Sequence, residues 1–176
     1  SKLLQCQLSE IPLSEKNNAN KANAIIGLNS FGSIVWPKEK GSGIEMPVMF
    51  IGGTYDLITP LVSEQFKIFL STTSNPLNRF LIIEGASHFS PIRINSGEIN
   101  NIFKIDETFI GSNPISVQDL SLRILAEFIN KINKQESLNL ISNQRELDLD
   151  FHILDKKKVK EISENLRRSG AYMPGI

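Results

Sequence analysis

The sequence contains a single cysteine, Cys6, which excludes an intrachain disulfide and a metal site built from several thiolates. Neither charge is in excess: 19 basic and 19 acidic residues argue against binding of nucleic acid or of a membrane surface through bulk charge. The longest apolar runs span about eight residues, whereas a helix needs about 20 to cross a bilayer. We therefore expect neither a nucleic-acid partner nor a membrane span.

Phosphate-binding and cofactor-binding motifs are missing as well. Gly52, Gly53 and Gly85 belong to neither a G-x-x-x-x-G-K loop nor a G-x-G-x-x-G fingerprint, so they are interpreted as turn residues. We predict no cofactor and no metal. The first residues do not have the pattern of a signal peptide, so the protein is expected to be soluble and cytoplasmic by default. A targeting sequence ahead of Ser1 would change that compartment.

The hydrophobic pattern predicts an α/β fold. With 40% apolar and 22% charged residues, a chain of 176 residues is long enough for a sizeable core. Short apolar runs predict buried strands, and apolar residues recur between and after them with helical spacing. The expected strands cover 24–28, 46–52 and 79–84, and the expected helices cover 60–71 and 117–133, the second opened by a capping box at Ser116. This alternation is typical of a parallel sheet flanked by helices.

Two of these strands are each followed by a side chain suited to acid–base chemistry. The stretch "FIGGTYDLITP" (50–60) contains Asp56, and the stretch "FLIIEGASHFSP" (80–91) contains His88. Reacting groups gather at the carboxyl ends of parallel strands, and successive strands of a βαβ unit lie close together, so we expect the two side chains to meet. A carboxylate that accepts the Nδ1 proton of a histidine leaves Nε2 free as a general base.

These segments resemble a known superfamily. "PVMFIGGTYDLITP" followed by "NRFLIIEGASHFSP" is similar to the acid and histidine segments of α/β-hydrolases. With "AIIGLNSFGSIVW" ahead of them, they look most like the bacterial predicted dienelactone hydrolases, a group close to the platelet-activating-factor acetylhydrolases. The resemblance implies that Asp56 is the acid and His88 the base of a Ser-Asp-His triad. It also implies hydrolysis of a carboxylic ester or a lactone, a small-molecule substrate.

The family's serine nucleophile, which sits in a G-x-S-x-G turn upstream of the acid, has no counterpart in this sequence. Ser30 in "LNSFG" lacks the first glycine, and Ser87 in "GASHF" lacks the second and is not followed by a helix pattern. The resemblance therefore implies that residues 1–135 are the C-terminal part of a hydrolase domain and that 136–176 are a tail with a short helix. We expect such a part to be inactive alone, and to associate with itself or with the missing N-terminal half.

Other interpretations stay open at this point. Asp56 is also a common residue in turns, and His88 is also a common residue at the end of a strand. The alternative to an enzyme is a non-catalytic α/β domain that binds a ligand, or an interaction module that docks a partner through 136–176. Cys6 is interpreted as a small apolar residue, and His152 as a surface residue with no nearby ligand partner.

Overall fold

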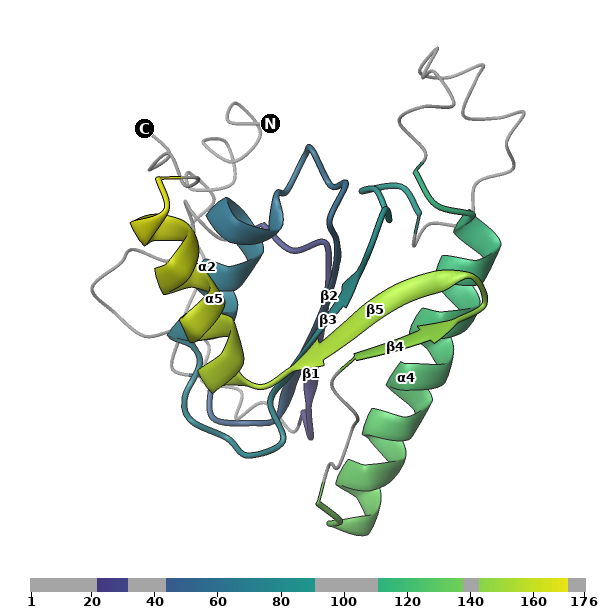
Figure 1. Cartoon of the computed structure of the whole chain (residues 1–176). Helices are drawn as coiled ribbons and strands as arrows, with labels where there is room; N and C mark the ends of the chain where they lie inside the picture. Colours follow the sequence, from purple (N-terminus) through teal and green to yellow (C-terminus); the bar gives the residue numbers. More distant parts are fainter. Residues whose placement is uncertain (1–21, 32–43, 91–110, 138–142, 171–176) are drawn as a thin grey trace, which may run out of the picture.

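The computed structural model describes residues 22–31, 44–90, 111–137 and 143–170 (Figure 1). These residues form a five-stranded sheet in the order β1-β2-β3-β5-β4. The strands are β1 (Ile25–Leu28), β2 (Val48–Gly53), β3 (Arg79–Ile83), β4 (Asn143–Glu146) and β5 (Leu149–Leu154). The helices are η1 (Leu61–Gln65), which is a π-helix, α2 (Phe66–Ser71), α4 (Pro114–Lys134) and α5 (Lys156–Arg168).

The first three strands are parallel, as the sequence predicts. β1 pairs with β2 in the register Ile25–Val48, and β2 pairs with β3 in the register Met49–Arg79. Every residue of β2 is buried, which is why its sequence is a continuous apolar run rather than an alternating one. The helix predicted over 60–71 is present as η1 followed directly by α2, and the helix predicted over 117–133 is α4.

The expectation of a parallel sheet holds only for this half, because the complete described sheet is mixed. β5 pairs antiparallel with β3, and β4 pairs antiparallel with β5. The segment 136–176 therefore contributes a hairpin to the sheet in addition to the predicted short helix, which is α5. The hairpin turn consists of Leu147 and Asp148, both with positive φ (52° and 60°). Leucine is rare in that conformation. Because Leu-Asp stands where Asn-Gly is usual, the sequence does not signal a hairpin turn here.

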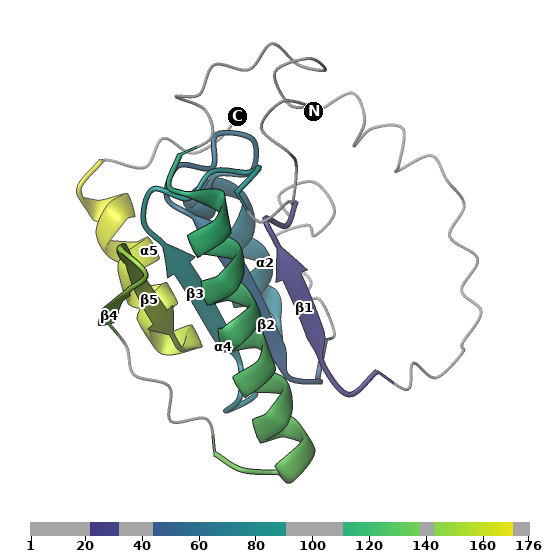
Figure 2. The same ribbon diagram turned by 90° about the vertical axis from the view of Figure 1, so that its right-hand side faces the viewer.

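Helices cover the two faces of the sheet and form two separate cores. α4 lies on one face, where its buried Leu120 and Phe128 pack with the strand residue Leu81. The pair of η1 and α2, together with α5, lies on the other face, where Phe69 and Val159 pack around Phe80. Figure 2 shows α4 in front of the sheet, the β4–β5 hairpin to one side of it and β1 to the other.

Helix α4 begins earlier than the sequence suggests. Asn113 caps it, because its Oδ1 accepts a hydrogen bond of 3.0 Å from the backbone N–H of Ile115, and Pro114 occupies the first turn. The predicted capping box at Ser116 is wrong, since Ser116 lies inside the first turn. None of the helices in the described segments combines the length and the apolar character that a membrane crossing requires.

Candidate functional site

Two loops bring the predicted acid and base together at the carboxyl ends of β2 and β3. Asp56 follows β2 by a short turn, and His88 lies on the loop that follows β3. The loops touch at Gly53, where an added Cβ would lie 1.9 Å from the carbonyl oxygen of Ala86. A hydrogen bond of 3.0 Å from the backbone N–H of Tyr55 to that same oxygen joins them. A side chain at position 53 would therefore force the two loops apart.

The Asp56 carboxylate is in hydrogen-bonding contact with the His88 ring, as the sequence predicts. His88 Nδ1 lies 3.0 Å from Asp56 Oδ2 and 3.1 Å from Oδ1. The Asp56 side chain is completely buried, whereas 20% of the His88 side chain is exposed. The carboxylate is thus shielded from water, and part of the histidine side chain is accessible.

Asp56 is held by several donors besides His88. Its Oδ1 accepts hydrogen bonds from the backbone N–H groups of Ile58 (3.0 Å) and Thr59 (2.8 Å). Its Oδ2 accepts from the Thr59 hydroxyl (2.7 Å) and the Gln65 side-chain amide (3.4 Å). Burial alone raises the pKa of the Asp56 carboxyl, but the hydrogen bonds from His88 and Thr59 outweigh it and hold that pKa below its ordinary value. Asp56 is therefore a carboxylate at neutral pH.

An ionised acceptor on Nδ1 gives His88 a defined chemical role. The carboxylate favours the tautomer with the proton on Nδ1, which leaves Nε2 with a lone pair that can take a proton from a hydroxyl group. Two aromatic rings flank the imidazole, Phe31 with a centroid distance of 6.5 Å and Phe89 with one of 5.6 Å. This pair of side chains can act as a general base and, once protonated, as a general acid.

Sequence reasoning did not identify three polar residues around the pair. Asn29, at the end of β1, donates from Nδ2 to the main-chain oxygen of His88 at 2.8 Å. The Thr59 hydroxyl lies 3.1 Å from His88 Nδ1 and 3.1 Å from the main-chain oxygen of Asn29. Gln65 is fully buried and also donates to the main-chain oxygen of Thr59 at 2.8 Å. The one sequence signal was Gln65, a polar residue on the otherwise apolar face of its predicted helix.

No serine or cysteine among the described residues hydrogen-bonds to the His88 ring. The Ser87 side chain is buried, its oxygen lies 3.2 Å from that of Ser90, and it accepts a hydrogen bond of 3.2 Å from the N–H of Phe89. Ser87 is thus engaged in the structure of its own loop. Ser30 follows β1 and is half-buried. Cys6 lies outside the described residues.

His152, predicted as a surface residue with no nearby ligand partner, is partly exposed and contacts one carboxylate. It lies on β5, and its Nε2 is 2.7 Å from Oε1 of Glu84, at the end of β3. The contact links the antiparallel half of the sheet to the parallel half. His152 and Glu84 therefore form a second histidine–carboxylate pair, in which the glutamate side chain is half exposed.

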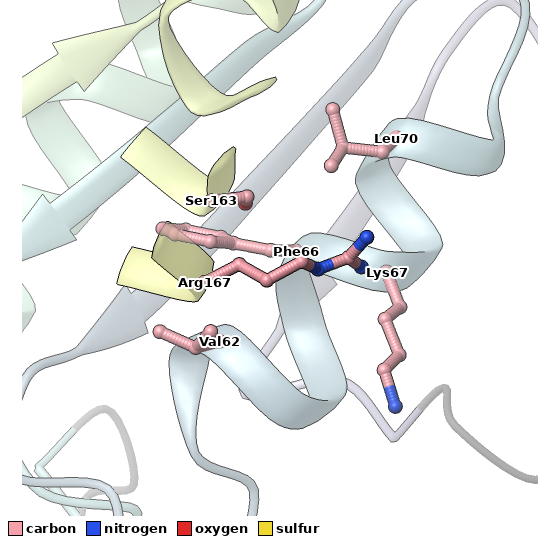
Figure 3. A pocket seen from close by; sticks show the side chains of 6 residues that line it. All are labelled: Val62, Phe66, Lys67, Leu70, Ser163 and Arg167. Atoms are coloured by element: carbon pink, nitrogen blue, oxygen red, sulfur yellow. The ribbon is translucent and has the colours of Figure 1, made fainter. Parts of the chain in front are cut away.

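A small hollow of about 80 Å³ lies between α2 and α5, on a different set of residues (Figure 3). It is lined by Val62, Phe66, Lys67, Leu70, Ser163 and Arg167. Neither Asp56 nor His88 lines it, so it is not the place where the pair would meet a substrate. Within the described segments no three histidine, cysteine or acidic side chains are grouped closely enough to hold a metal ion.

Comparison with known proteins adds no further information about this site: no protein-family model and no curated protein matches the chain.

Proposed function

We propose that this chain supplies the acid and the base of a serine hydrolase that acts on carboxylic esters or lactones. The observation that carries the proposal is the contact of 3.0 Å between the buried Asp56 carboxylate and His88 Nδ1. A non-catalytic binding domain predicts instead that the two side chains point apart or make separate contacts. The resemblance of the surrounding segments to α/β-hydrolases supports the same conclusion.

The proposed reaction uses His88 twice. As a serine hydroxyl attacks the ester carbonyl, Nε2 of His88 takes the hydroxyl proton, and Asp56 stabilises the imidazolium that results. His88 then gives this proton to the leaving alcohol, and an acyl-enzyme remains. In the second half His88 takes a proton from water, the hydroxide attacks the acyl carbonyl, and the serine recovers its proton as the carboxylic acid leaves.

The serine and the donors that stabilise the tetrahedral oxyanion are proposed to come from a segment that is not part of these 176 residues. The sequence has no G-x-S-x-G turn, and in α/β-hydrolases the oxyanion donors are the amide after the nucleophile and one from an earlier loop. Residues 1–135 would then be the C-terminal part of the hydrolase domain. Because a His–Asp pair without these groups stabilises little developing charge, the chain alone is proposed to be inactive.

An uncovered apolar surface beside β1 is where such a segment is proposed to pack. β1 is at the edge of the described sheet, and its Ile26 and Leu28 are 40% and 48% exposed. On α4, exposed Ile115, Leu122 and Ile129 recur at intervals of two turns. Arg123 of α4, by contrast, pairs with Glu146 of the hairpin. An open edge with apolar side chains favours association.

The experiment is a panel of p-nitrophenyl esters, from acetate to longer acyl chains, together with simple lactones. It is run on a protein in which a G-x-S-x-G segment accompanies the 176 residues, and labelling with a fluorophosphonate identifies the serine. We expect turnover of at least one ester and labelling of that serine. Inactivity across the whole panel combined with the absence of labelling would contradict the proposal.

A further inference from the structure

Asn29 connects the ends of all three parallel strands. It is the first residue after β1, and its backbone N–H donates to the carbonyl of Ile51 on β2 at 2.9 Å. Its side-chain Nδ2 donates to the carbonyl of His88, on the loop after β3, at 2.8 Å. Its own carbonyl accepts from the Thr59 hydroxyl at 3.1 Å. The residue is 8% exposed, so these hydrogen bonds are shielded from water.

The backbone at this position suits asparagine in particular. The φ angle of Asn29 is 45°, in the left-handed region, which asparagine adopts far more readily than most residues with a Cβ. The amide orientation is also determined, because Nδ2 must face the carbonyl of His88 for a hydrogen bond to form. Oδ1 is left buried and without a partner among the described residues. The Asn29 amide therefore keeps its hydrogen bond to His88 although its Oδ1 is left without one, which is an energetic cost.

The same network determines which nitrogen of His88 carries the proton. The Thr59 hydroxyl has one proton and two acceptors close by, Asp56 Oδ2 at 2.7 Å and the Asn29 carbonyl at 3.1 Å. With its proton directed to either of these, the hydroxyl presents a lone pair to His88 Nδ1, 3.1 Å away. Nδ1 then faces acceptors only, which stabilises the Nδ1–H tautomer and leaves Nε2 free.

We propose that Asn29 is a positioning residue for the His88 base. Its amide ties the main chain of His88 to the end of β1, and its carbonyl helps to direct the Thr59 proton away from the imidazole. Asn29 acts through His88 and Thr59 and not on a substrate. Only the consequence for turnover depends on the proposed hydrolase function, whereas the effect on the imidazole follows from these contacts alone.

The test is nitrogen-15 NMR of the histidine rings in the 176-residue chain, and it needs no enzymatic activity. Asn29→Gly keeps the left-handed backbone but removes the amide, and Asn29→Asp keeps the shape but replaces the donor with an acceptor. Asn78→Gly removes another buried asparagine, whose amide donates to Thr72 and Thr73. Asn78 directly precedes β3, at the opposite end of the strand from His88. Thermal unfolding of each variant identifies any that does not fold.

We expect the wild-type chain and Asn78→Gly to show His88 in a single Nδ1–H tautomer. Both Asn29 variants should keep that tautomer, which Asp56 and Thr59 stabilise, but their Nδ1 proton should exchange with water about fivefold faster, as the loss of one hydrogen bond that holds the His88 main chain implies. An unchanged exchange rate of that proton in a folded Asn29 variant would overturn the proposal. So would an equal change in Asn78→Gly, because the effect would then be general loosening. If the chain is not a hydrolase, these spectra stay as expected, so the two proposals fail separately.

Discussion

The buried carboxylate of Asp56 is the common acceptor of the hydrogen bonds in the candidate site. Its negative charge is retained in the interior because the N–H groups of Ile58 and Thr59, the Thr59 hydroxyl and the His88 ring all donate to it. A carboxylate held by this many donors has one orientation, and its hydrogen bond with Nδ1 orients the imidazole of His88. An amide or a hydroxyl at this position would carry no charge and could not accept all of these hydrogen bonds.

Replacing the carboxylate by an amide gives the first prediction. In the active protein that includes the nucleophile, we expect Asp56→Asn to reduce kcat by roughly 10⁴-fold, because the amide cannot stabilise the Nδ1–H tautomer or the imidazolium. The fold should persist, since the two side chains have the same shape. Initial rates with a p-nitrophenyl ester measure the effect, with Asp119→Asn on the exposed side of α4 as the control. A loss of less than tenfold would argue against a triad role.

The second prediction concerns stability and pH. The pKa of Asp56 lies below its ordinary value of 3.8, so ionisation of this carboxyl stabilises the folded chain fully above that value. The stabilisation is lost as the pH falls from 3.8 toward the lower folded-state pKa. We expect the urea midpoint of the wild-type chain to fall over this range more steeply than that of Asp56→Asn. Parallel curves for the two proteins would contradict the assigned direction of the shift.

The sequence reveals only part of the site at the residue scale. Asp56 and His88 could be predicted because each follows a recognisable buried strand, and a parallel pairing of those strands brings their ends together. Asn29 and Thr59 could not, because each is a common polar residue whose role depends on a three-dimensional contact. The left-handed backbone of Asn29 has no signal in a single sequence.

At the scale of elements, the parallel strands and the long helices follow from hydrophobic pattern, and the β4–β5 hairpin does not. Leu149, Phe151 and Ile153 alternate on one buried face of β5, which is a strand signal. The turn before them, however, has Leu147 where positive φ calls for asparagine or glycine, and the acidic residues around it give the segment a polar appearance. The atypical turn is therefore the reason why the sequence does not predict β5.

This turn gives the third prediction. Leu147→Asn combined with Asp148→Gly replaces two residues at positive φ by residues that favour it, and we expect a gain of about 1 kcal/mol in the free energy of unfolding. Little burial is lost, because Leu147 is exposed. Urea denaturation measures the change, with Leu57→Asn, an exposed leucine in another loop, as the control. A destabilised double variant would show that the turn is not under conformational strain.

At the scale of the whole molecule, the described residues cover both faces of the sheet with helices and leave β1 as an unpaired edge. α4 covers the centre of one face, while β1 at the edge keeps Ile26 and Leu28 in contact with solvent. Exposed apolar side chains are also present on α4. In the hydrolase account, the β1 edge is the place for the segment that carries the serine.

The fourth prediction is that the isolated chain associates through this surface. We expect oligomers in sedimentation-velocity experiments at micromolar concentration, and we expect Leu28→Lys to weaken them because a charge on an open strand edge opposes pairing. Leu147→Lys is a matched control, since both leucines are 48% exposed and Leu147 lies on the distant hairpin. A chain that sediments as a monomer at every concentration, or equal effects of the two lysines, would contradict the assignment of the surface.

A comparison of the two histidines is the sharpest test of the proposed triad. The chain has only two, and both contact a carboxylate, His88 with Asp56 and His152 with Glu84. Esterase activity is measured with the serine-bearing segment present, for the unchanged protein, for His88→Gln and for His152→Gln. We expect His88→Gln to lose at least a thousandfold in kcat, as removal of a triad base does, and His152→Gln to keep nearly all of it. Retention of activity by His88→Gln, or an equal loss in both variants, would contradict the proposed triad.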